Sequence, residues 1–93
     1  MEFNLRFSDN FLKQYNSLTK KDPLLKQKVK KLLKIIQVNP YYPGLHTHKV
    51  NNPTWGEVLS SRVTGDIRLI WTFDNNKRLT LIVLEIGRHD EVY

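Results

Sequence analysis

The 93-residue sequence contains no cysteine, which excludes a disulfide framework and a metal site built on thiolates. It has no apolar run near the roughly eighteen residues of a membrane-spanning helix, and its start lacks the long apolar stretch of a signal peptide. Internal repeats, low-complexity segments and linkers are also missing. These absences predict one small domain, residues 1–93, with no membrane partner, and they fit a reducing cytoplasm.

Charge, by contrast, is plentiful and unevenly placed. Residues 1–34 hold nine lysines and arginines against three acids, whereas residues 35–93 hold six of each. The whole formal net charge of +6 therefore lies in the first third of the chain. A local basic surface suits a phosphate backbone, an acidic partner or anionic lipid, although a solvated lysine-rich helix face has the same composition.

The first half of the sequence predicts one strand and two helices. Apolar and polar residues alternate over 3–7, as in a short strand. Ser8 can cap the first helix, and Asp22 before Pro23 has the pattern of a second helix start. The prolines of 39–44 end that helix. The apolar residues of the two helices recur at spacings of three and four: Phe11, Leu12, Tyr15 and Leu18, then Leu25, Val29, Leu32, Leu33 and Ile36.

The second half predicts three antiparallel strands, over 57–63, 66–73 and 79–86, joined by turns. The segment that carries His46 and His48 is expected to be a loop before them. The order of a strand, two helices and an antiparallel meander indicates an α+β domain, with the helix pair on one face of the sheet and the other face open. The residues expected on the helix side of the middle strand are Ile67, Leu69, Trp71 and Phe73.

Several polar residues of the second half could act on RNA. Cleavage through the 2′-hydroxyl needs a base for its proton, positive charge near the phosphate and an acid for the leaving 5′-oxygen. Histidine suits both proton roles because its pKa lies near about 6.5. Each residue also has an ordinary structural interpretation. Arg68, for example, could simply pair with Asp66 on the same strand face. Two histidines without a third ligand make a poor zinc site, so neither a metal nor a cofactor is expected. The candidates are His48, Arg62, Asp66, Arg68, His89 and Tyr93.

The pattern as a whole resembles the RelE/ParE superfamily of toxin–antitoxin toxins, nearest its YafQ-like branch of ribosome-dependent mRNA endonucleases. The resemblance covers the chain and is most specific from His48 onward. HTHKV followed by PTWGE resembles the family's loop histidine and Gly-x-Trp, and Asp66 before RLIW resembles its Asp before a strand. The ending IGRHDEVY resembles Gly-x-His with an aromatic residue four positions later, here Tyr93.

The resemblance implies roles for these residues. His48 would be the base or a proton shuttle, with Asp66 as its acidic partner, and His89 the acid or a phosphate contact. Arg68 would stabilise transition-state charge, and Tyr93 would stack on a base or orient the phosphate. The expected partners are a cognate antitoxin, the ribosome and mRNA. The lysines that would bind RNA are Lys20, Lys21, Lys26, Lys30, Lys31, Lys34 and Lys49.

Two departures from the YafQ-like pattern leave alternatives open. Arg62 stands where that branch has a further histidine, and Ile67 stands where it has tryptophan. These changes shift the expected site toward the RelE style and favour a hybrid, with His48 and His89 for protons and Arg62 and Arg68 for charge. A ParE-like gyrase inhibitor without chemistry, a ribosome-independent RNase or RNA binder, and an inactive relative remain alternatives. The tail after the last strand is expected to fold back or to cross the sheet face if it is to join the site.

Overall fold

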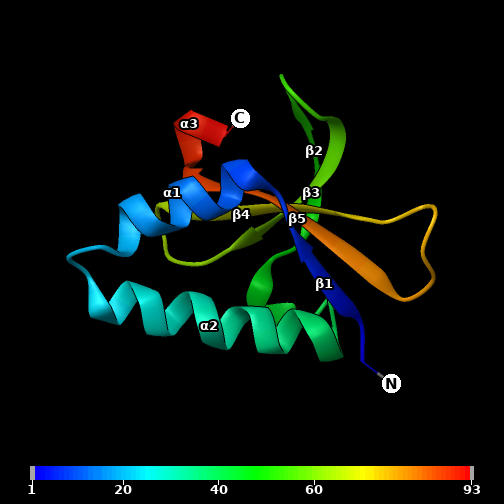
Figure 1. Ribbon diagram of the computed structural model, residues 1–93, viewed down its shortest axis with the longest axis horizontal. Helices are drawn as coiled ribbons and strands as arrows, with labels where there is room; N and C mark the ends of the chain where they lie inside the picture. Colours follow the sequence, from blue (N-terminus) through cyan, green and yellow to red (C-terminus); the bar gives the residue numbers. More distant parts are fainter. Residues whose placement is uncertain (1, 93) are drawn as a thin grey trace.

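The computed structural model describes residues 2–92, and its five strands form one mixed sheet in the order β1-β5-β4-β3-β2. Strand β1 runs parallel to β5, and the other neighbouring strands are antiparallel. Figure 1 shows α2 below the sheet, α1 at the height of β4 and β5, and the short last helix above them. The elements are β1 (Asn4–Phe7), α1 (Asp9–Thr19), α2 (Pro23–Val38), a 3₁₀ turn (Pro43–Leu45), β2 (His48–Asn52), β3 (Gly56–Arg62), β4 (Ile67–Phe73), β5 (Thr80–Arg88) and α3 (His89–Val92).

Both long helices begin at the predicted caps. The Ser8 hydroxyl accepts a hydrogen bond from the Phe11 N–H at 3.0 Å, and the Asp22 carboxylate accepts one from the Leu25 N–H at 3.0 Å. These side chains satisfy N–H groups that have no partner within a helix. Local sequence therefore places the start of each helix, and packing against the sheet stabilises the rest.

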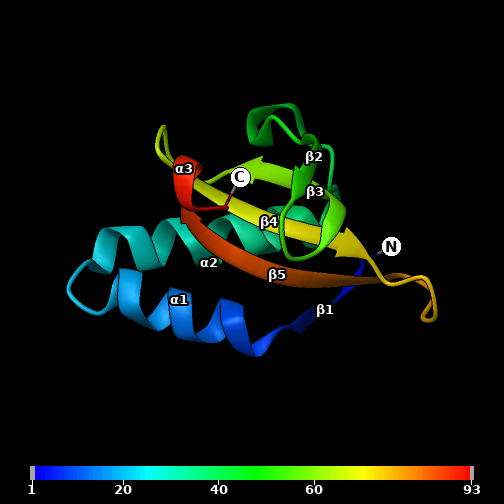
Figure 2. The same cartoon turned by 90° about the horizontal axis from the view of Figure 1, so that it is seen from above.

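The helix pair covers one face of the sheet, as predicted. Figure 2 shows α2 behind the sheet and α3 in front of it. The core between the helices and the sheet includes the predicted side of β4, with Leu69 and Trp71 fully buried. The Trp71 indole donates to the Ser61 hydroxyl at 2.8 Å, so its one polar group is satisfied inside this core.

The far face of the sheet is partly covered, which corrects the sequence-based expectation of an open face. Val92 of α3 packs there against Val58, Ile70 and Leu84 in a second, smaller core. The expected loop around His48 is also wrong, because residues 48–52 form the edge strand β2. The pattern HKVNN has only one apolar residue, so its pairing with β3 gives no signal in the hydrophobic periodicity.

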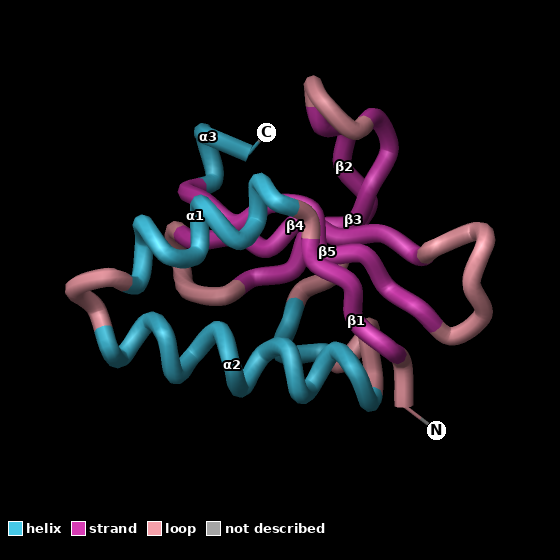
Figure 3. The backbone as a smooth tube through the Cα atoms, in the orientation of Figure 1, coloured by secondary structure: helices cyan, strands magenta, loops and turns pink. Residues whose placement is uncertain are grey.

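Several connections lie at the two ends of the sheet (Figure 3). The α1–α2 connection and the β3–β4 turn are at one end, and the β4–β5 loop is at the other. None of the helices within residues 2–92 has the length and apolarity needed to cross a membrane.

Candidate functional site

Charged side chains gather at the end of the sheet where β3 ends, β4 begins and β5 ends. We call this set the arginine rim: Arg62, Asp66, Arg68, Arg88 and His89. Strand register brings these residues together, because the antiparallel meander returns β5 to the end of the sheet from which β4 started. The members of the rim come from three different strand ends in the sequence yet form one edge in space.

Two arginines of the rim lie directly opposite each other. The register of β3 and β4 pairs Arg62 with Arg68, so both side chains leave the same face of the sheet. Directly opposed residues have Cβ atoms about 5 Å apart, and like charges in such positions repel. Arg62 is exposed and has no ion pair with any residue of the described range. A bound anion between the two guanidinium groups would relieve their repulsion.

Arg68 is partly engaged by the β3–β4 turn. Its Nη1 donates to the carbonyl oxygens of Thr64 at 2.8 Å and Gly65 at 3.1 Å. A guanidinium carries five N–H donors, so these bonds orient the group and leave other donors for a ligand. The turn itself is braced by the Thr64 hydroxyl, which accepts from the Ile67 N–H at 3.0 Å.

Asp66 faces Arg88, not Arg68. Its carboxylate lies 2.7 Å from Nη1 of Arg88, and both side chains are more than half exposed. Strand alternation would put Asp66 on the face of Arg68, but Asp66 lies in the bend before β4, where alternation does not apply. Arg88 stands opposite Ile67 of the helix-side core, so the pair lies on the helix side of the rim.

The tail reaches the rim without folding back, which corrects the sequence-based geometry. Arg88 pairs with Ile67 at the start of β4, and the next N–H, that of His89, donates to the Asp66 carbonyl at 2.9 Å. His89 is exposed and begins α3 directly after β5. After His89, α3 runs across the far face of the sheet, which is the second alternative expected from the sequence. Tyr93 lies outside the described residues.

His48 lies on the same face as the two opposed arginines, but not at the rim. It pairs with Ser60, two residues along β3 from Arg62, and its Nδ1 is 2.9 Å from the His46 carbonyl oxygen. Strands β2 and β5 are three strand spacings apart, so His48 and His89 are separated by at least about 14 Å, counted across the strands alone. The backbones of the two histidines are therefore not neighbours.

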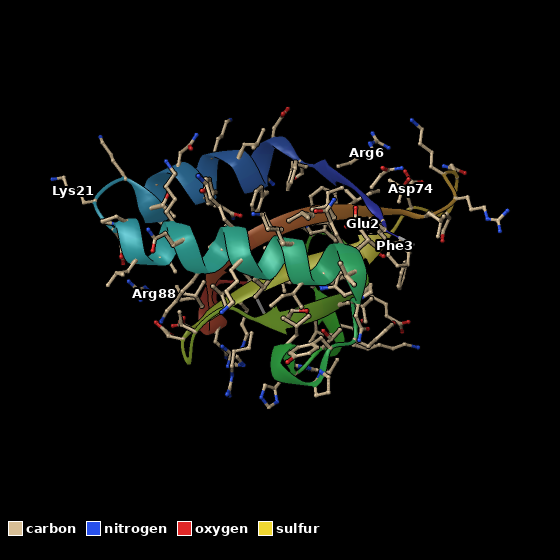
Figure 4. The ribbon with its side chains drawn as sticks, turned by 90° about the horizontal axis from the view of Figure 1, so that it is seen from below. Glu2, Phe3, Arg6, Lys21, Asp74 and Arg88 are labelled. Atoms are coloured by element: carbon tan, nitrogen blue, oxygen red, sulfur yellow. The ribbon has the colours of Figure 1, made fainter. Side chains whose placement is uncertain are left out.

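The predicted RNA-binding lysines of α2 lie on the other side of the molecule. Lys26, Lys30, Lys31 and Lys34 are exposed on the helix that covers the opposite face of the sheet. Lys20 and Lys21, in the α1–α2 connection, are at the same end of the molecule as the rim, and Figure 4 shows Lys21 and Arg88 at that end.

Lys49 is set apart from the other lysines. It lies on β2, 3.9 Å from the Glu57 carboxylate. The predicted lysine set therefore does not form one continuous surface.

Sequence reasoning missed two basic residues of this region. Lys28 and Arg88 line a cavity of about 390 Å³ between the helix hairpin and the rim, whose apolar wall includes Leu25 and Ile67. Arg88 is visible in the sequence as the arginine of IGRHDEVY, but its pairing with Asp66 depends on strand register and could not be predicted. Lys28, like Lys31, falls outside the four-residue spacing of Lys26, Lys30 and Lys34. Within the described range, no three histidine, aspartate or glutamate side chains are grouped as a metal site.

Solved structures share the fold of this chain over nearly its whole length. A YoeB/ParE toxin from Agrobacterium tumefaciens superposes with a TM-score of 0.77 at 15% identity, covering 94% of this chain and 99% of that one. YafQ from E. coli strain BL21(DE3) gives 0.74 at 20% identity, with 97% of each chain covered. A chain of the E. coli DinJ–YafQ toxin–antitoxin complex gives 0.75 at 18% identity, covering 100% of this chain and 99% of that one.

The chain has the RelE/ParE-like fold. No protein-family model and no curated protein sequence matches it. The RelE/ParE-like fold is thus established by three-dimensional similarity, in agreement with the resemblance found in the sequence. At these identities the solved structures carry the arrangement of elements and not the roles of individual side chains.

Proposed function

We propose that this protein is the toxin of a type II toxin–antitoxin system and that it cleaves mRNA on the ribosome. The observation that carries the proposal is the pair of directly opposed arginines, Arg62 and Arg68, beside His89 at one end of the sheet. Two cations directly opposite each other repel, and an anion bound between them would offset that repulsion through charge-assisted hydrogen bonds. An RNA phosphate supplies that anion, and the RelE/ParE-like fold is shared with proteins named as toxins.

The proposed reaction is an attack of the ribose 2′-hydroxyl on the adjacent phosphate. His48 removes the 2′-hydroxyl proton as the oxygen bonds to phosphorus, and His89 gives a proton to the 5′-oxygen as its bond to phosphorus breaks. The products are a 2′,3′-cyclic phosphate and a free 5′-hydroxyl. Arg62 and Arg68 hold the negative charge that grows on the phosphoryl oxygens, a contribution of about 10²- to 10³-fold for one well-placed donor. The mechanism uses protein side chains alone.

Asp66 has a positioning role in this scheme. Its carboxylate holds Arg88 at 2.7 Å, and its carbonyl accepts the backbone N–H of His89 at 2.9 Å. Both bonds tie the end of β5 to the start of β4. Asp66 thereby places His89 beside the two arginines, and it acts on the His89 side of the site, not on His48. Tyr93, the last residue, is proposed to contact the base or the phosphate.

The lysines of α2 are proposed to hold ribosomal RNA while the far face of the sheet takes the message. The two surfaces lie on opposite sides of a molecule whose extents are 35 × 29 × 25 Å. A protein with RNA contacts on two sides can lie between two RNA elements. Lys20 and Lys21 connect the two surfaces at the rim end. Such a target would place the protein in the cytoplasm.

The proposed protein partner is a cognate antitoxin with an acidic, amphipathic segment. The C-terminal half of α2 has a pocket of about 340 Å³ with an almost wholly apolar wall, flanked by Lys31 and Lys34. Val38 is 62% exposed there, and Tyr42 is 49% exposed. Apolar anchors with acids on either side would match this surface, in the manner of a helix docked in a groove. A similar fold occurs in the DinJ–YafQ complex, which contains an antitoxin.

The decisive experiment compares the parent chain with His89→Ala in a cell-free translation reaction, followed by primer extension on the message. We expect cuts within codons that require translating ribosomes and that fall by about 10²-fold or more in the variant, because His89 supplies the proton for the leaving group. Circular dichroism of the purified variant checks that the fold is retained.

Two other outcomes would contradict the proposal. Cuts in naked RNA without ribosomes would indicate a free ribonuclease. Growth arrest with intact message, unaffected by His89→Ala, would favour the ParE-like alternative, a gyrase inhibitor that needs no acid–base chemistry. Asp90→Ala, a neighbouring exposed substitution on α3, serves as the matched control and is expected to cut like the parent.

A further inference from the structure

A β-bulge in β5 turns an acidic side chain toward the far face of the sheet. Val83 and Ile86 both lie in the helix-side core, although residues three apart on a regular strand face opposite sides. The pairing with β4 shifts register between Ile70 and Trp71, so that Leu84 and Glu85 together oppose Ile70. A bulge of this kind re-aims side chains, and here both inserted positions leave the helix side.

Glu85 uses this placement to join three elements. Its Oε2 accepts hydrogen bonds from the Trp55 indole N–H at 2.8 Å and from the Asn52 amide at 3.2 Å. Its Oε1 accepts from the Gln14 amide of α1 at 3.2 Å. Trp55 and Asn52 belong to the tip of the β2–β3 hairpin, so the half-buried carboxylate draws the tip across the sheet onto β5.

Asn52 extends the connection to the C-terminal helix. It is only 5% exposed, and both polar atoms of its side chain are used twice. Its Oδ1 accepts from the N–H groups of Thr54 at 2.8 Å and Trp55 at 3.0 Å, which shapes the hairpin turn. Its Nδ2 donates to the Val92 carbonyl at 2.8 Å as well as to Glu85.

The short helix α3 depends on such external contacts. Four residues are too few for a helix to be stable by itself. Its first residue is held at the arginine rim by the bond from the His89 N–H to Asp66, and its last is held by Asn52 and by the burial of Val92. The helix is therefore fixed at both ends, and the orientation of His89 depends on both.

We propose that Asn52 and Glu85 are positioning residues that clasp α3 over the sheet and so aim His89 at the scissile phosphate. The clasp consists of Asn52, Trp55, Glu85 and the Val92 carbonyl. Its effect on catalysis rests on the proposed function, whereas its effect on α3 does not. A side chain aimed at a reacting atom must be held closely, because a displacement of about 1 Å can cost on the order of 10²-fold in rate.

Asn52→Asp separates the contacts that shape the hairpin turn from the contact that holds α3. Aspartate keeps an oxygen for the Thr54 and Trp55 N–H groups, so the hairpin turn is retained, but it cannot donate to the Val92 carbonyl and it places a second carboxylate beside Glu85. Asn51→Asp is the matched control, because it makes the same substitution one residue earlier on β2, where the side chain is exposed.

Two readouts test the proposal. In hydrogen exchange followed by mass spectrometry, the segment 88–92 of Asn52→Asp should lose protection while β3 and β4 retain theirs, and Asn51→Asp should match the parent. In message cleavage on programmed ribosomes, kcat should fall on the order of 10²-fold with KM nearly unchanged, because the lysine surface that binds the ribosome is unaltered.

Each contrary result would overturn one specific part of the proposal. Unchanged protection of 88–92 in Asn52→Asp would overturn the clasp. Lost protection with unchanged kcat would overturn the positioning role. A parent chain that cuts no message would overturn the proposed function, and the exchange result would still report on the clasp. If Asn52→Asp fails to fold, Glu85→Gln is the second variant. It removes the anionic acceptor shared by Trp55 and Asn52 and should loosen the hairpin tip and lower kcat.

Discussion

The two ends of β4 carry the same ion pair in different surroundings. Arg6 and Asp74 are joined at 2.9 Å at one end, and Arg88 and Asp66 are joined at 2.7 Å at the other. The Asp74 side chain is 5% exposed, whereas that of Asp66 is 58% exposed. Figure 4 shows Arg6 and Asp74 together at the end opposite Arg88.

The surroundings decide what each pair does. Asp74 also accepts the Asn76 N–H at 2.9 Å, so its carboxylate organises the β4–β5 loop and ties it to β1. Asp66 instead lines a cavity of about 390 Å³ and stands among the cations of the arginine rim. One pair is a structural link and the other belongs to a surface with excess positive charge. The distance within each ion pair, taken alone, would not have distinguished these two roles.

The largest expected effect comes from removing the opposed arginines. Arg62→Ala with Arg68→Ala should lower message cleavage by at least about 10²-fold, because neither guanidinium group remains to stabilise transition-state charge. Arg78→Ala, an exposed arginine in the loop at the far end, should leave cleavage unchanged. Primer extension on the same message measures all three proteins. An equal loss of cleavage in Arg78→Ala would mean that the arginine rim is no more important for cleavage than the opposite end of the sheet.

A smaller effect is expected from the lysines of α2. Reversing the charge of Lys26, Lys30 and Lys34 to glutamate should weaken ribosome binding and reduce the slope of log affinity against log salt by about one for each phosphate that is no longer bound. Sedimentation with ribosomes over a range of salt concentrations gives that slope. An unchanged slope would mean that these lysines are only a solvated helix face. Lys77→Glu, at the far end, is the control.

The smallest expected effect concerns stability in acid. The Asn76 N–H, together with Arg6, lowers the pKa of Asp74 below its ordinary value of 3.8. A carboxyl group whose pKa is lowered on folding adds stability above its unfolded pKa, and that stability is lost as the pH falls through the folded pKa. Thermal unfolding from pH 5 to acid should therefore show a difference between parent and Asp74→Asn that shrinks below about pH 4.

Asp66→Asn provides the comparison for this stability test. Its exposed ion pair should contribute little to thermal stability, since exposed pairs are worth about 0–1 kcal/mol. We expect Asp66→Asn to melt close to the parent and Asp74→Asn to melt lower. The reverse order would show that the rim pair, and not the far-end pair, holds the sheet together.

Most of the fold could be predicted from local patterns. The caps Ser8 and Asp22 start α1 and α2 where expected, and the strands predicted over 57–63, 66–73 and 79–86 differ from β3, β4 and β5 by only one or two residues at their ends. These signals are strong because each comes from the side chains of a single segment. The alternation in β4 also predicted which side chains enter the core.

The errors have a common physical cause. Strand β2 has little apolar content, so its existence depends on pairing with β3. Helix α3 is stabilised by Asn52 and by the small core around Val92, both contributed by distant segments. Glu85 faces its partners only because a bulge adds a residue to β5. Pairing, docking and bulges are contacts between segments, and local periodicity carries no record of them.

The order of amino acids is enough to specify most of the elements, their succession and the residue types available for chemistry, because capping, alternation and charge are properties of neighbouring residues. Which of those residues meet is settled only when the segments pair in three dimensions. That pairing sets Arg62 against Arg68, gives Asp66 to Arg88, and joins Asn52 to the tail through the Val92 carbonyl. The reason is register: a shift of one residue in a strand pair would exchange the partners which that pair brings together.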